Sequence, residues 1–232
     1  MKVEKWIIAL GIFTIANGSV FAEEMIVKVQ KNYSESAGMA LLSEIIKSDL
    51  ADKDLYSGIV YHNLANFSMA KREEYVNRSI SLLTKYKNTN PVGCAYLGSA
   101  ITLMGSVNEK KKKVLDALKN LEEGAALIDA AVTKSPDDIS IRMVRIQNAV
   151  GTSKGSPVKR WEIAHKDIVY LKTRESSLSP DFRAELYYNS GEVNIGEKKT
   201  AEAIKDYTAS IKASPNSTAA AQSRKSLAKY SE

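Results

Sequence analysis

Residues 184–217 read AELYYNSGEVNIGEKKTAEAIKDYTASIKASPNS, and they hold the clearest structural signal in the chain. Apolar residues recur here at helical spacing, which predicts two amphipathic helices over about 181–195 and 198–213. Pro215 lies just past the second helix, and Ser217 can cap the start of a further one. The stretch therefore predicts a helix–turn–helix pair followed by another helix.

The prolines indicate that such pairs repeat along the chain. If Pro157 is set aside, Pro91, Pro136, Pro180 and Pro215 follow one another at intervals of 45, 44 and 35 residues, which is typical of helical repeats. At a constant offset of 45, the segment before Pro91 aligns with the segment before Pro136. Apolar residues then match apolar ones and small residues match small ones, as in Val76 on Leu121, Leu82 on Leu127, Leu83 on Ile128 and Ser79 on Gly124.

The pattern predicts a lone helix, four helix pairs and a closing helix. Their expected ranges are 34–49, then 55–67 with 71–87, 91–105 with 109–134, 138–150 with 157–173 and 181–195 with 198–213, and finally 217–229.

Composition favours the same all-α class. The 232 residues are 44% hydrophobic and only 7% aromatic, with 5 prolines and 12 glycines, which argues against a β sandwich or barrel. One cysteine and 2 histidines leave little material for a metal site. We therefore expect no metal and no cofactor, and no enzyme.

The first 22 residues have the parts of a secretory signal: lysines at 2 and 5, an apolar stretch, and small residues before a cut after Ala22. We expect an exported protein, periplasmic or secreted, with no transmembrane span after cleavage and no nucleic-acid partner. The expected division is a signal at 1–22, an N-terminal segment and lone helix at 23–54, four pairs at 55–215 and a capping helix at 216–232.

The last pair resembles the tetratricopeptide repeat (TPR) family, whose motif sets aromatic, small and proline residues at fixed slots. The matching residues here are Tyr187, Gly191, Ala203, Tyr207 and Pro215, with glycine and alanine where two helices approach closely and tyrosines filling the adjacent groove. Ser190 and Ser210 depart from the usual Leu and Ala.

Earlier pairs match the motif less well. Cys94-x-x-Leu97-Gly98-x-x-Ile101 and Tyr61-x-x-Leu64-Ala65 keep part of its spacing, whereas the helix over 138–150 places Arg142 and Arg145 at slots that are normally apolar.

The resemblance implies a right-handed α-solenoid whose first helices line a concave groove that binds a protein or peptide. Carried over slot by slot, the expected contact residues are His62, Asn66, Ala95, Ser99, Met143, Gln147, Glu185, Tyr188 and Glu192. Each could equally be a solvated position on an open face. The set has no basic cluster of the kind that clamps a peptide carboxylate.

Two other functions remain open. Lys110, Lys111, Lys112 and Lys113 could attract an anionic polymer or lipid of the cell envelope, or they could be a solvated helix start. Cys94 could be a hydrolase nucleophile, but it needs a base, and the chain offers only His62 and His165.

Overall fold

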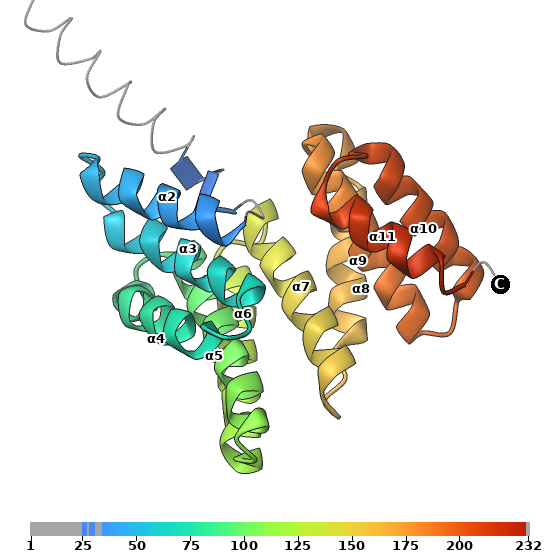
Figure 1. The fold of residues 1–232 in the computed structure, drawn as a ribbon. Helices are drawn as coiled ribbons and strands as arrows, with labels where there is room; N and C mark the ends of the chain where they lie inside the picture. The colour runs from blue at the N-terminus through green and yellow to red at the C-terminus, as the bar shows by residue number, and fades with distance from the viewer. Residues whose placement is uncertain (1–24, 27, 31–33, 231–232) are drawn as a thin grey trace, which may run out of the picture. The chain divides into compact units, whose positions relative to one another are not determined.

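The computed structural model describes residues 25, 26, 28–30 and 34–230, and all regular structure in these residues is helical (Figure 1). The signal at 1–22 lies outside the described residues. The chain divides between Tyr86 and Lys87 into two compact units, which we call the N-terminal unit and the C-terminal unit. The all-α class predicted from the sequence is confirmed.

The N-terminal unit contains helices α2 (Glu35–Lys47), α3 (Lys53–Phe67) and α4 (Arg72–Leu83), then a short 3₁₀ turn at Thr84–Tyr86. Helix α2 packs on α3, and α3 packs on α4. The core between them is built from aliphatic side chains with almost no exposed surface, namely Leu42, Ile45, Ile59, Leu64, Val76 and Leu83.

The C-terminal unit contains three helix pairs and a final helix. They are α5 (Pro91–Lys110) with α6 (Val114–Lys134), α7 (Ile139–Gly155) with α8 (Trp161–Lys172), α9 (Pro180–Gly196) with α10 (Thr200–Ala213), and α11 (Thr218–Leu227). A short 3₁₀ turn at Glu175–Ser177 separates α8 from α9. The helices lie close to the expected ranges, with three exceptions: α5 runs on to Lys110, α7 runs on to Gly155, and α8 begins at Trp161 instead of residue 157.

Local capping chemistry explains where these helices begin. The side chains of Asn90, Asp138, Ser179 and Ser217 each accept a hydrogen bond from a backbone N–H three residues later, at 3.0–3.3 Å. Two of these caps are followed by a proline in the first turn of the helix, where a missing N–H costs nothing. Because caps and prolines are local signals, the sequence predicts these starts well.

Small residues let the paired helices cross closely. A Cβ placed on Gly98 would lie 2.5 Å from the carbonyl oxygen of Gly124, and one on Gly124 would lie 2.3 Å from that of Gly98. In the last pair the buried hydroxyl of Ser210 donates to the carbonyl of Ala184 at 2.7 Å. No larger side chain fits at the α5–α6 crossing, so glycine at both positions sets the interhelical distance.

The α3–α4 crossing follows the same rule. The buried Ser79 hydroxyl donates to the carbonyl of Gly58 at 2.9 Å, as Ser210 does to Ala184. The predicted alignment of Ser79 with Gly124 is therefore confirmed, because both residues lie at the crossing of their own pair.

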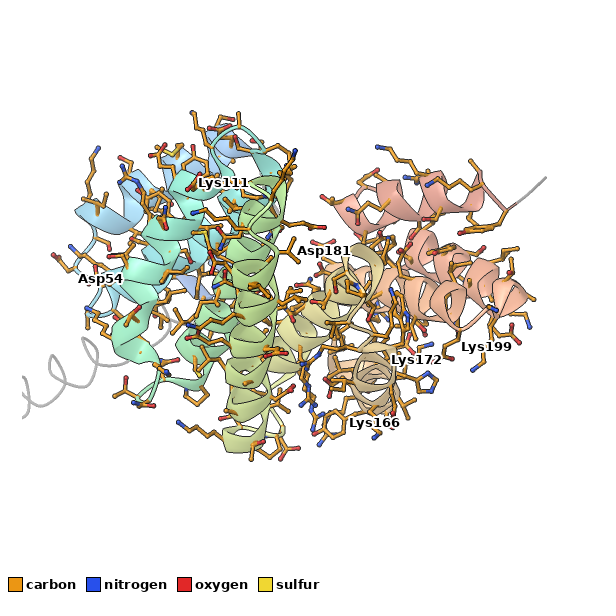
Figure 2. All side chains as sticks on the ribbon, turned by 90° about the horizontal axis from the view of Figure 1, so that it is seen from below. Asp54, Lys111, Lys166, Lys172, Asp181 and Lys199 are labelled. Atoms are coloured by element: carbon orange, nitrogen blue, oxygen red, sulfur yellow. The ribbon has the colours of Figure 1, made fainter. Side chains whose placement is uncertain are left out.

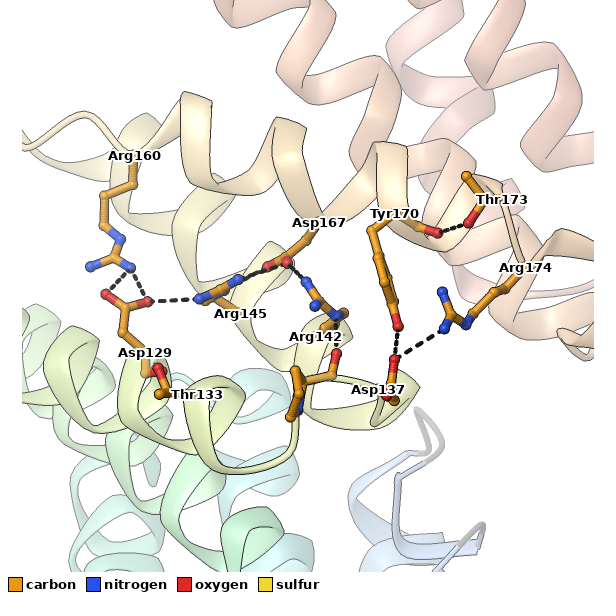
Figure 3. Close-up of polar contacts among 11 residues, drawn as sticks. Asp129, Thr133, Asp137, Arg142, Arg145, Arg160, Asp167, Tyr170, Thr173 and Arg174 are labelled. Carbon is orange, nitrogen blue, oxygen red and sulfur yellow. Dashed lines mark hydrogen bonds and ion pairs between the residues drawn. The ribbon is translucent and has the colours of Figure 1, made fainter.

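The third pair, α7 with α8, uses charge in addition to apolar packing (Figure 3). Asp167 of α8 is fully buried, and it accepts hydrogen bonds from Arg142 and from Arg145 of α7. The arginine pair that breaks the repeat pattern in the sequence thus neutralises a buried carboxylate on the facing helix.

Candidate partner-binding face

The first helices of the three C-terminal pairs pack in succession, α5 on α7 and α7 on α9. Hydrogen bonds between side chains mark each contact: Asn148 donates to the Thr102 hydroxyl at 2.6 Å, and Gln147 donates to Glu185. Lys154 forms an ion pair with Glu192 seven residues further along both helices, so α7 and α9 run parallel there. We call the surface formed by α5, α7 and α9 the first-helix face.

The nine expected contact residues differ in their exposure. Asn66 and Gln147 are exposed, and Glu185 and Tyr188 are half-buried. The other five are buried, namely His62, Ala95, Ser99, Met143 and Glu192. In this structure only the first four have side-chain surface that a partner could contact.

Glu192 is buried beneath four neighbouring side chains, each of which forms a hydrogen bond or an ion pair with its carboxylate. Tyr207 donates to it at 2.8 Å and Ser226 at 3.3 Å, Lys154 pairs with it, and Tyr188 contributes a further hydrogen bond. Burial, with the adjacent carboxylate as a further cause, raises the pKa of both tyrosines, which stay protonated as donors. Glu192 therefore ties α9 to α7, α10 and α11.

His62 is buried in α3, and its Nδ1 lies 2.9 Å from Oδ1 of Asn63. Asn63 in turn donates to the carbonyl of Val29 at 2.7 Å, which holds the segment before α2 against α3. Burial lowers the pKa of His62 to about 4, so the imidazole is neutral at pH 7. The residue lies in the packed interior.

Sequence reasoning missed two polar residues of the first-helix face, Thr102 and Asn148. For Thr102, the missing information is the register of the α5–α6 pair. Gly105 lies seven residues before the left-handed Lys112, as Gly191 lies seven residues before the left-handed Lys198, so Gly105 is the structural equivalent of Gly191. A Cβ on Gly105 would lie 3.5 Å from Leu121 of α6, which is the counterpart of Tyr207. The slot assignment from the sequence places Gly98 in the glycine slot, seven residues before Gly105, and therefore does not include Thr102.

The predicted approach of the last two paired helices is confirmed. A Cβ on Gly191 would lie 2.5 Å from the Tyr207 ring, which therefore needs glycine opposite it. Tyr187 lies four residues earlier and donates to Glu175 at 2.7 Å, and burial together with this carboxylate raises its pKa to about 12.

Lys110, Lys111, Lys112 and Lys113 are all exposed, but their position differs from the expected helix start. Lys110 is the last residue of α5, and the other three form the turn that leads into α6. Lys111 of this turn is labelled in Figure 2. Lys112 has a φ of 60°, in the left-handed region, which directs the chain back along α5.

Cys94 does not have the surroundings of a nucleophile. Its side chain is buried against α6, with Sγ 3.5 Å from the Leu127 carbonyl, and burial raises the pKa of the thiol. His165 is exposed on α8, where Nδ1 lies 3.4 Å from Oε1 of Glu197. The thiol therefore stays protonated, and these contacts do not support the hypothesis that Cys94 is a hydrolase nucleophile.

Within the described residues, no group of three or more His, Cys, Asp or Glu side chains is placed to hold a metal ion. No helix in the described part of the chain has the length and apolar character needed to cross a bilayer. Comparison with protein-family models, with curated proteins and with solved structures finds no match for this chain.

Proposed function

We propose that this protein is an exported, non-catalytic scaffold of the TPR type, which binds a protein or peptide partner through the first-helix face. The order of helix contacts supports the proposal. In the C-terminal unit each first helix packs on its own partner and on the next first helix, and α6 and α8 each pack on the first helix of the following pair. Such nearest-neighbour packing is the construction principle of a solenoid, and we propose that this one is right-handed.

The exposed chemistry of the face indicates what the partner offers. Gln147 and Glu185 together present amide and carboxylate groups, and half-buried Tyr188 adds part of its side-chain surface. Lys154, two turns further along α7, contributes a cation to the same face. We expect the partner to be an extended peptide whose backbone amides and polar side chains form hydrogen bonds with these residues of the first-helix face.

Capture of partners from envelope extracts tests the proposal. Gln147→Lys with Glu185→Lys replaces an amide and a carboxylate of the first-helix face with two positive charges. We expect this variant to lose capture of at least one partner. The matched control is Lys205→Glu with Lys212→Glu on the exposed surface of α10, which we expect to leave capture unchanged. Equal capture of every partner by wild type and the first variant would remove the assignment of this face.

A second candidate function is association with an anionic polymer or lipid of the envelope through Lys110–Lys113. The observation that favours it is the exposure of all four lysines in one turn. Such adsorption should weaken as salt rises, because the charges are screened beyond roughly 10 Å at 0.1 M ionic strength.

A further inference from the structure

Two turns of the C-terminal unit have the same backbone. Lys112 between α5 and α6 has a φ of 60°, and Lys198 between α9 and α10 has a φ of 63°. The N–H of Lys113 bonds to the carbonyl of Asn108 at 2.9 Å, and the N–H of Lys199 bonds to that of Asn194 at 2.7 Å. The two turns are therefore structural equivalents at an offset of 86 residues.

The side chains that brace the two turns are also equivalent. Asn108 donates to Asn120 at 2.8 Å, and Asn194 donates to Asp206 at 2.8 Å, each across its own helix pair. Because the same hydrogen bonds occur at both turns, we infer that each turn's geometry depends on its asparagine, Asn108 or Asn194, and on its left-handed lysine. It does not require the other residues at the tip.

Those other residues differ between the two tips. The α5–α6 tip reads Lys110-Lys111-Lys112-Lys113-Val114-Leu115, whereas the α9–α10 tip reads Gly196-Glu197-Lys198-Lys199-Thr200-Ala201. At the second tip Lys199 pairs with Glu197 at 2.6 Å, which lowers the local charge. The first tip therefore has an excess of cations and two large apolar residues that the shared geometry does not need.

The apolar pair faces solvent. Val114 is 60% exposed and Leu115 is 82% exposed, the largest exposed fraction among the large hydrophobic residues that the structure describes. Leaving a leucine in water forgoes the stabilisation that burial would give. An apolar pair next to four exposed lysines is the arrangement found where a protein surface meets the headgroup region of a membrane.

We propose that the α5–α6 tip docks on an anionic lipid bilayer, with the lysines at the lipid phosphates and Val114 and Leu115 in the outer part of the acyl layer. The proposal rests on the second candidate function and selects lipid as the anionic surface. Charge complementarity supports it: exposed Lys119 adds to the four lysines, and Glu109 and Asp116 offset only part of their charge. Each lysine near such a surface strengthens adsorption about fivefold.

A polyanion without lipid would account for the lysines alone. It would gain nothing from Val114 and Leu115, because apolar side chains gain free energy only by leaving water for an apolar medium. The juxtaposition of the two residue types therefore favours a bilayer over a soluble or cell-wall polymer.

The test places an environment-sensitive fluorophore at one tip or the other in the full chain. Leu115→Cys and Ala201→Cys, each in a Cys94→Ala background, provide matched labels on equivalent turns. Vesicles are phosphatidylcholine alone or with phosphatidylglycerol as the anionic lipid. We expect the emission at position 115 to shift to the blue only with anionic vesicles, and the emission at position 201 to stay unchanged.

A transplant variant separates the two contributions. Val114→Thr with Leu115→Ala copies the α9–α10 tip, and we expect it to lower co-sedimentation with anionic vesicles about tenfold while the melting temperature stays unchanged. Lys110→Gln with Lys113→Gln should lower it about 25-fold, since each lysine contributes about fivefold, and 0.5 M salt should reduce binding of the wild type.

The outcomes are distinct. If the transplant variant binds anionic vesicles as well as the wild type, or if both tips report the membrane equally, lipid docking by this tip is overturned. If lysine-dependent binding is then found to dextran sulfate, a polyanion is the partner and the second candidate function survives. If the lysine variant changes neither vesicle nor dextran sulfate binding, that function fails as well.

Discussion

The guanidinium of Arg145 donates two hydrogen bonds to the carboxylate of Asp167, at 2.6 and 2.7 Å, although Asp167 has no exposed surface. Arg142 donates to the same carboxylate, and its Cζ also lies 3.7 Å from the centre of the Tyr170 ring. Because removing one member of a buried ion pair leaves the others without a counter-charge, this contact has a large effect on stability.

Asp167→Asn should therefore destabilise the C-terminal unit by about 3–5 kcal/mol. The reason is that two partly buried guanidinium groups lose their shared carboxylate. Urea unfolding followed by circular dichroism measures the change. Glu162→Gln, which removes an exposed ion pair with Lys166 on the same helix, should leave the midpoint where it is. A wild-type midpoint for Asp167→Asn would show that the arginines are adequately hydrated.

Gly191→Ala should destabilise the last pair by about 1–3 kcal/mol, because the new methyl group meets the Tyr207 ring. The cost should shrink in a Tyr207→Leu background, where the smaller side chain leaves room. Gly151→Ala is the matched control: it is a helical glycine with nothing within 4 Å of the added Cβ, and it should gain about 0.5–1 kcal/mol. Thermal melting of Gly191→Ala, of Gly191→Ala with Tyr207→Leu, and of Gly151→Ala measures these changes in stability. Equal changes for Gly191→Ala and Gly151→Ala would contradict the prediction.

The buried His62 makes stability depend on pH. Its pKa falls from 6.5 to about 4 on burial, so the unfolded chain binds more protons between these values. The stability that the neutral imidazole contributes is full above pH 6.5 and is lost as the pH falls from about 6.5 to about 4, by up to about 3 kcal/mol. His62→Gln should remove this part of the dependence.

Melting temperatures of wild type and His62→Gln, compared at pH 7 and pH 4.5, measure that difference. His165→Gln is the control, because His165 is exposed. The prediction is wrong if the gap between wild type and His62→Gln is the same at both pH values.

Cys94 should react slowly with a thiol reagent in the folded protein and quickly in urea. Its buried position and the raised pKa of the thiol both lower the concentration of accessible thiolate. Labelling followed by mass spectrometry at pH 7.5 measures the two rates. Rapid labelling in the native state would revive the hydrolase hypothesis.

The sequence predicts the helices well because their signals are local. Asp138 and Ser217 cap helices whose first residues lie close to the predicted positions, and Pro91 begins α5 at the predicted helix start. The last pair carries Gly191 and Tyr207 at a spacing that already indicates their contact. These features need only a few neighbouring residues to be interpreted.

Burial and register could not be predicted in the same way. Gly98 and Gly105 lie seven residues apart on one helix face, so a single sequence offers two equivalent registers and gives no reason to choose. Glu192 is a polar residue at an exposed slot of the motif, but α11 supplies Ser226 from 34 residues away and helps to bury it. Such contacts depend on the tertiary structure.

The charged contacts of α7 also constrain which helices can be neighbours. Arg145 lies between carboxylates on both sides, Asp167 of α8 and Asp129 of α6, and Arg160 shares Asp129 (Figure 3). A copy of another pair inserted at this point would leave at least one of these charges buried without a partner. The sequence thus specifies the order of its helix pairs. A shuffled or duplicated arrangement of the same helices would be less stable at this junction.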